Sequence, residues 1–216
     1  MYRLISCLIF LAFHGCANAT SNSVIELDAS SVTTLAPNII ETKLEETPFD
    51  IWERIRLELT LSIPDDQIAS TSSYRERLYK NQTAVNRISK SGQRYLYHTL
   101  TRAEELGLPV ELALLPFVES EFDPFAKSFA GATGIWQFMP ATGKAYGLKS
   151  NWWYDGKKDV LASTEAALEY LTYLHDRFEG DWLLAMAAYN TGPTRVKRAL
   201  RKNKSQDKRI RFWDLN

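Results

Sequence analysis

The segment LLPFVESEFDPFA, Leu114–Ala126, places three acids directly behind an apolar run. If this segment is helical through its second phenylalanine, Glu119 and Glu121 point about 200° apart and cannot converge on one bond. Glu119 and Asp123 are four residues apart, a spacing that places two side chains on one helix face. However, Pro124 disfavours helical backbone at the residue before it. The segment therefore favours a single acid with a chemical role rather than a carboxylate pair.

Glu119 differs from the other two acids in its apolar surroundings. A carboxyl group that is partly removed from water keeps its proton to higher pH, because desolvation penalises the charged form. Such a group can act as a general acid near neutral pH. We interpret Glu121 and Asp123 as solvated loop acids. The apolar neighbours of Glu119 in the sequence are Leu115, Pro116, Val118 and Phe122.

The chain from Pro48 onward has a helical hydrophobic period, with apolar residues recurring at steps of three and four. No run of alternating apolar and polar residues is long enough to predict a sheet. We therefore expect a mainly α, compact, bundle-like domain. The pattern predicts a helix from Pro48, a helical stripe over Tyr74–Leu106 interrupted near Ser91–Gly92, a helix from Pro109 kinked or restarted at Pro116, short helical pieces in Gly134–Gly147, a long helix in Asp159–Glu179, and a helix capped by Asp181.

The composition places the chain among ordinary globular proteins. Of its 216 residues, 45% are hydrophobic and 24% are charged, and the formal net charge is +0 at pH 7. A neutral chain has no bulk attraction to nucleic acid. The segment Thr194–Arg211 does hold nine Lys or Arg residues and one acid. We interpret it as a solvated helix face or a contact with an anionic envelope polymer, and we expect no nucleic-acid partner.

The first 19 residues have the pattern of a secretory signal peptide. Arg3 precedes an apolar run, Leu4–Phe13, which is shorter than the roughly 20 residues that a spanning helix needs. Small residues then lead to a cleavage site after Ala19. A second processing route is open, because Cys16 follows a glycine and could be the lipid-modified first residue of a bacterial lipoprotein. Residues 20–47 are rich in Ser, Thr and Glu and predict a flexible tether.

Metal and cofactor sites are not predicted. The three histidines, at 14, 98 and 175, are scattered, and both cysteines lie in the signal segment. The chain has no glycine-rich phosphate loop, and Ser120 has no histidine nearby in the sequence to activate it. Aromatic residues gather in the C-terminal half, where they suit either core packing or stacking on sugar rings. They are Trp136, Tyr146, Trp152, Trp153, Tyr154, Trp182 and Tyr189.

Three short motifs together resemble the signature of a known family. They are VES at 118–120, GIWQ at 134–137 and AAYN at 187–190. In order and spacing these motifs are similar to those of the lytic transglycosylase domain, and the likeness extends from about Pro48 to the C-terminus. The resemblance implies a goose-type-lysozyme-like α fold. It also implies cleavage, without water, of the β-1,4 bond between N-acetylmuramic acid and N-acetylglucosamine in peptidoglycan, leaving a 1,6-anhydromuramoyl end.

The resemblance further implies a role for each motif residue. Glu119 would be the sole catalytic acid and base, and Ser120 would help to orient the glutamate or the substrate. Tyr189 would hold the carboxyl of Glu119 through its hydroxyl, and Asn190 would bind nearby. The residues that would shape the sugar groove are Gly134, Trp136 and Gln137.

The expected organisation follows from these observations. Residues 48–107 would form an N-terminal helical extension and residues 108–216 a catalytic domain. Relatives usually continue beyond the FWDL region into a helix with a groove-lining tyrosine and often into LysM repeats, so we expect this catalytic domain to be C-terminally short. The protein would act in the periplasm or cell envelope, on peptidoglycan glycan strands. A hydrolytic lysozyme-type muramidase and a non-catalytic peptidoglycan-binding scaffold are the alternative functions.

Overall fold

The computed structural model describes residues 50–203 and 210–215. The expected signal peptide, the tether and the possible lipid site at Cys16 lie outside these ranges. Within them, the regular elements are α-helices and short 3₁₀ helices (η), accompanied by isolated β-bridges. The elements are α2 (Ile51–Glu58), η1 (Asp65–Gln67), α3 (Ile68–Lys80), α4 (Gln82–Glu105), η2 (Val110–Leu114), α5 (Leu115–Glu119), α6 (Pro140–Ala145), α7 (Val160–Arg177), α8 (Trp182–Thr191), α9 (Pro193–Lys202) and η3 (Phe212–Asp214).

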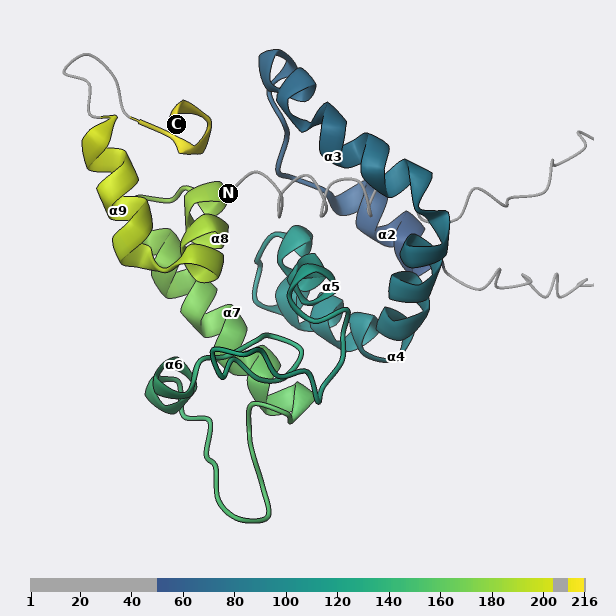
Figure 1. Cartoon of the computed structure of the whole chain (residues 1–216), viewed down its shortest axis with the longest axis vertical. Coiled ribbons are helices and arrows are strands. Elements are labelled where there is room, and N and C mark those ends of the chain that lie inside the picture. Colours follow the sequence, from purple (N-terminus) through teal and green to yellow (C-terminus); the bar gives the residue numbers. More distant parts are fainter. Residues whose placement is uncertain (1–49, 204–209, 216) are drawn as a thin grey trace, which may run out of the picture.

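The helices form two sides of the molecule, with α5 between them (Figure 1). One side consists of α2, α3 and α4, and the other of α7, α8 and α9. The two sides meet where α4 contacts α7, and α4 also packs on η2. The mainly α class expected from the sequence is confirmed. Among the helices of the described ranges, none is both long and apolar enough to cross a bilayer.

Side-chain caps fix the beginning of the main helices. The Asn81 side chain accepts a hydrogen bond from the backbone of α4, at Ala84 N, over 3.2 Å. Asp159 caps α7 in the same way, and the Asp181 carboxylate accepts from Leu184 N of α8 over 2.9 Å. Such caps satisfy backbone donors that have no partner inside the helix. The cap expected at Asp181 is therefore confirmed.

One helix boundary differs from the sequence prediction. The stripe over Tyr74–Leu106 is broken at Asn81, between α3 and α4, and not at Ser91–Gly92, where α4 is continuous. A Cβ atom at Gly92 would lie 2.6 Å from the ring of Phe117. Gly92 therefore serves close packing of α4 against α5, although a glycine in a helical pattern resembles a helix break.

The core is built around the short η2–α5 segment. Leu112, Leu114 and Leu115 are completely buried there. Pro116 lies in the first turn of α5, where its missing N–H costs no helical hydrogen bond, so the restart expected at this proline is confirmed. A second cluster joins α7, α8 and α9 to the C-terminal residues Phe212 and Leu215. The N-terminal helix α2 therefore shares the first cluster with the segment that carries Glu119, whereas the C-terminal residues belong to the second.

Glu111 of η2 holds the N-terminal helices on this core. Its side chain is buried, and its Oε1 accepts hydrogen bonds from Thr60 N at 2.7 Å and Leu61 N at 2.6 Å. Arg54 of α2 also forms an ion pair with Glu104 of α4. The Glu111 contacts connect the segment after α2 directly to the segment that leads to Glu119.

Candidate active site

Glu119 is the last residue of α5. The helix stops there because Ser120 leaves the helical region, with φ −148°, and the next two residues adopt positive φ, 54° at Glu121 and 60° at Phe122. A continuous helix through Phe122, assumed in the sequence argument, is therefore wrong. Left-handed backbone is strained for residues other than glycine. The surrounding packing maintains it, because the Phe122 ring is buried and contacts Phe117 at a centroid distance of 4.6 Å.

The Glu119 carboxyl combines partial burial with a single amide donor. Asn190 Nδ2, near the end of α8, donates to Glu119 Oε1 over 3.1 Å. Burial raises the pKa of Glu119 above its ordinary value of 4.5, and the hydrogen bond from Asn190 lowers it by a smaller amount. The raised pKa expected from the apolar neighbours is thus present. A carboxyl in this condition keeps its proton to higher pH than an ordinary glutamate, and it can both release and take up a proton.

Ser120 connects the end of α5 to the GIWQ turn. Its Oγ donates to the backbone oxygen of Ile135 over 2.8 Å. The serine hydroxyl is therefore engaged with the protein, next to Glu119 in the chain. This contact holds the C-terminal end of α5, and with it Glu119, in place relative to the turn.

Single residues explain the conformation of the GIWQ turn, residues 134–137. Gly134 has φ 83°, and a Cβ atom there would lie 1.7 Å from the backbone oxygen of Lys157. Gln137 has φ 49°, and its side-chain amide donates to Gly134 O over 2.9 Å and to Ala126 O over 3.3 Å. Only glycine fits at position 134. Both residues thus build the turn itself, and the Gln137 amide N–H groups are directed into the loop.

Trp136 lies behind the site. Its side chain is 0% exposed, and its indole N–H donates to Thr164 Oγ1 of α7 over 3.0 Å. Trp136 therefore supports the turn from within, and its expected part in shaping the sugar groove stays a prediction. Thr164 was not predicted as part of the site, since it is one small residue in a regular helical pattern and carries no local signal.

Tyr189 does not hold Glu119 as expected. Its hydroxyl donates to the backbone oxygen of Trp136 over 2.7 Å. Burial raises the pKa of Tyr189 well above its usual value, and the negative charge of Glu119 raises it further. The two side chains are therefore close enough to interact electrostatically, although the direct donor to the carboxyl is Asn190. Tyr189 links α8 to the GIWQ turn.

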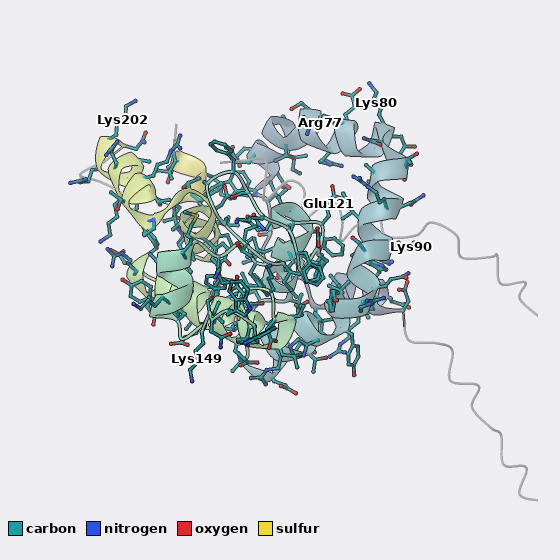
Figure 2. The ribbon with its side chains drawn as sticks, turned by 60° about the horizontal axis from the view of Figure 1, so that its bottom comes forward. Arg77, Lys80, Lys90, Glu121, Lys149 and Lys202 are labelled. Atoms are coloured by element: carbon teal, nitrogen blue, oxygen red, sulfur yellow. The ribbon has the colours of Figure 1, made fainter. Side chains whose placement is uncertain are left out.

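The two remaining acids of the opening segment are held away from Glu119. Glu121 pairs with Arg87 of α4 over 3.0 Å, and in Figure 2 it lies on the α4 side of the molecule. Asp123 accepts a hydrogen bond from Phe125 N over 2.8 Å, a local turn within the loop. Their interpretation as loop acids without a place beside Glu119 agrees with these contacts.

The aromatic residues divide into buried and exposed groups. Tyr170 of α7, which the sequence did not single out, contacts Tyr189 at 5.5 Å and Tyr146 at 4.9 Å between ring centroids. Its position three residues before another tyrosine in α7 was the available signal. Trp152 and Trp153 are instead 86% and 89% exposed, on the loop between α6 and α7. Among residues 50–203 and 210–215, no group of His, Cys, Asp and Glu suited to a metal ion is present.

A comparison with protein families decides the classification. The model of the transglycosylase SLT domain matches residues 99–212. The chain belongs to the transglycosylase SLT domain family. The match contains all three motifs and the candidate acid. The lysozyme-like helical fold expected from the motifs is therefore confirmed.

Individual SLT-domain proteins are similar to the chain over different lengths. The chain is 41% identical over 166 residues to membrane-bound lytic murein transglycosylase D of Escherichia coli K12, an alignment that covers 77% of this chain and 36% of that protein. It is 30% identical over 109 residues to soluble lytic murein transglycosylase of Salmonella typhimurium, covering 47% of this chain and 16% of that protein. The X-ray structure of lytic transglycosylase Slt from Pseudomonas aeruginosa is 31% identical, with a TM-score of 0.43, over 52% of this chain and 18% of that chain.

Proposed function

We propose that the chain is a peptidoglycan lytic transglycosylase, exported to the cell envelope and active in cell-wall turnover. It would cleave the β-1,4 bond between N-acetylmuramic acid and N-acetylglucosamine and leave a 1,6-anhydromuramoyl end. Membership of the SLT domain family and the names of the relatives support this activity. One structural observation carries it: Glu119 is a partly buried carboxyl with a raised pKa and one amide donor.

In the first step, protonated Glu119 acts as the general acid. It donates its proton to the glycosidic oxygen while the bond from that oxygen to muramoyl C1 breaks. Positive charge develops on the sugar as in an oxocarbenium ion, with assistance from the substrate's own acetamido group. Burial supports this step because it keeps Glu119 protonated at a pH where an ordinary glutamate has lost its proton.

In the second step, the same residue acts as the general base. The Glu119 carboxylate takes the proton of the muramoyl C6 hydroxyl while that oxygen forms a bond to C1. The acid is thereby regenerated, and no water is consumed. The Asn190 amide stabilises the carboxylate that exists between the two steps. Intramolecular attack of this kind reaches effective molarities on the order of 10⁵ M or more.

The absence of a paired carboxylate favours this mechanism over one with a second catalytic acid. Among the described residues, the side chain that bonds Glu119 is an amide, and Glu121 and Asp123 have partners elsewhere. An inverting glycosidase, in contrast, needs a second carboxylate to activate water. A nucleophile that belongs to the substrate needs none.

The other motif residues would act mainly by positioning. We assign Ser120, Gly134, Gln137 and Tyr189 to holding the GIWQ turn against α5 and α8, because each bonds or fits the protein there. Trp136 would support the turn from the core. Asn190 would contact the carboxyl directly. Residues 48–107 would form the helical extension and 108–216 the catalytic domain, joined through Glu111 and Thr60.

Product analysis tests the activity. Purified murein sacculi are digested with the chain, and the released fragments are separated and weighed by mass spectrometry. A lytic transglycosylase gives 1,6-anhydromuramoyl ends. Reducing ends would reject the proposal in favour of a hydrolytic muramidase, and sacculus binding without released fragments would reject it in favour of a non-catalytic scaffold.

The processing of the N-terminus is a separate proposal. We favour cleavage after Ala19 over lipid modification of Cys16, because an aromatic residue and a histidine precede the glycine before Cys16. Cells that express the full chain are labelled with a radioactive fatty acid. The protein should carry no label, and a labelled protein that loses its label on Cys16→Ser substitution would establish the lipid anchor.

A further inference from the structure

The connection between α8 and α9, which follows Asn190 in the chain, contains an open cavity. Its volume is about 460 Å³, and it is lined by Thr191, Gly192, Thr194, Arg195 and Arg198. Thr191 directly follows Asn190, the residue that bonds Glu119, and Gly192 turns the chain from α8 into α9 with φ 88°. Thr191, which lines the cavity, is therefore the direct chain neighbour of the residue that bonds Glu119.

The cavity carries unneutralised positive charge. Arg195 and Arg198 are three residues apart on α9, a spacing that places them on one helix face. Both are exposed, and within the described part of the chain neither forms an ion pair. α9 itself contains no acid, and its N-terminal end, at Pro193, adds the positive end of the helix dipole. Two free guanidinium groups at a concave surface suit a carboxylate, which each can bind with two parallel hydrogen bonds.

Peptidoglycan carries carboxylates on the same muramoyl residue that reacts. The muramoyl sugar that reacts at C1 carries, on C3 of the same ring, a lactyl group that leads into the stem peptide. The stem peptide contains free carboxyl groups and no sugar. A strand that presents C1 to Glu119 therefore brings an acidic peptide to the immediate surroundings of Asn190.

We propose that this cavity, formed by Thr191, Arg195 and Arg198, binds a carboxylate of the stem peptide on the muramoyl residue whose bond is cleaved. The inference rests on the proposed function, since it assigns part of the same substrate to a second site. It makes the stem peptide a specificity determinant. Strands with acidic peptides would bind more tightly than bare glycan.

Equilibrium binding tests the proposal without turnover. The background is Glu119→Gln, so that no strand is cleaved during the measurement. Three soluble glycan strands of one length are compared: strands with intact stem peptides, strands whose peptides have been removed with an amidase, and strands whose peptide carboxyls have been converted to amides. The intact strands should bind roughly tenfold more tightly than the other two, the size expected for charge-assisted hydrogen bonds near the surface.

Charge-matched variants assign the effect to the cavity. Arg195→Ala with Arg198→Ala should reduce the tenfold preference to about one. Lys197→Ala with Arg201→Ala removes the same charge from α9 at positions that do not line the cavity, and should keep the preference. All four side chains are exposed, so thermal melting should detect little change in either pair.

Three results would overturn the proposal: equal binding of intact and peptide-free strands, equal binding of intact and amidated strands, or equal loss of preference in both charge-matched pairs. The amidated strands separate recognition of the carboxylate from recognition of the peptide's bulk. Failure of the proposed function is seen independently, because it appears as missing anhydro products from the unsubstituted chain while the binding preference is measured in the inactive background.

Discussion

Two glutamates of one short stretch, Glu111 and Glu119, have opposite surroundings. Glu111 lies in η2 with 1% of its surface exposed, and it accepts hydrogen bonds from Thr60 N and Leu61 N. Glu119 ends α5, is partly exposed, and accepts one hydrogen bond, from Asn190. The carboxyl group of Glu111 is held by backbone N–H groups of the segment that follows α2. That of Glu119 is held by a side chain and borders solvent.

The difference shows how the protein uses the same side chain for structure and for chemistry. A buried carboxyl group that accepts several backbone hydrogen bonds is fixed in place, and it connects two parts of the chain. A carboxyl in an apolar setting with one donor can change its protonation state, because little stabilises the anion. Substitutions at the two ends of the η2–α5 segment should therefore separate stability from activity.

The largest expected effect is the loss of activity in Glu119→Gln. Glutamine keeps an oxygen that can accept from Asn190 but cannot exchange a proton, so release of anhydro products from sacculi should fall by roughly 10²–10⁴-fold or more. Circular dichroism and thermal melting should show a folded protein. Activity near that of the unsubstituted chain would remove Glu119 from its catalytic role.

The same variant has a predicted stability signature. Since the pKa of Glu119 is raised above 4.5 in the folded chain, the folded state binds more protons than the unfolded chain between pH 4.5 and the raised pKa. The free energy of unfolding of the unsubstituted chain therefore falls as pH rises through this window. Glu119→Gln has no such titration, so its stability relative to the unsubstituted chain should increase with pH there. A relative stability that is constant or falls with pH would contradict the burial of this carboxyl.

The next effect concerns the GIWQ turn, which is bonded to Ser120, the residue after Glu119. Gly134→Ala should lower the free energy of unfolding by about 3–5 kcal/mol, because the new methyl would lie 1.7 Å from Lys157 O and φ is 83°. Gly147→Ala is the matched control: φ is 77°, but nothing lies within 4 Å of the added methyl, so about 1–2 kcal/mol is expected. Urea unfolding measures both. Equal losses would mean that backbone conformation alone, without the clash, explains Gly134.

Some of this site could be predicted from the sequence because its signals are local. The apolar neighbours of Glu119 predict its raised pKa, Pro116 predicts the helix restart, and Asp181 predicts a cap. Each of these depends on residues within one helical turn. The identification of Glu119 did not require knowing where α5 ends.

Other features could not be predicted because they depend on contacts between distant segments. The left-handed turn at Phe122 has no glycine to announce it and is maintained by packing on Phe117. Gly92 resembles a helix break until the ring beside it is known. The hydroxyl of Tyr189 can reach either a carboxyl or a backbone oxygen, and only the fold selects Trp136 O.

In η2, at the start of the η2–α5 segment, Glu111→Ala should lower the stability of the fold and leave the activity nearly unchanged. Without the carboxylate, Thr60 N and Leu61 N lose their acceptor, and the free energy of unfolding should fall by about 1–3 kcal/mol. Glu111→Gln keeps one acceptor oxygen and should lose less. Activity per folded molecule should stay within about twofold for both variants. A large fall in activity at unchanged stability would show that Glu111 positions Glu119 and is more than an attachment point.

The smallest expected effect, and the most specific one, is the change in pH dependence caused by Asn190→Ala. The hydrogen bond from Asn190 favours the charged form of Glu119 and so lowers its pKa. Without it the pKa rises, the protonated acid persists to higher pH, and the alkaline limb of the activity profile should move upward. Activity at the optimum should fall by about tenfold, as expected for one hydrogen bond to a charged group. Asn203→Ala removes an amide that bonds Ala199 O at the C-terminal end of α9 and should leave the profile in place. An alkaline limb that stays fixed or moves downward in Asn190→Ala would show that Asn190 does not act on the carboxyl, and the proposed distinction between the two glutamates would then have to rest on burial alone.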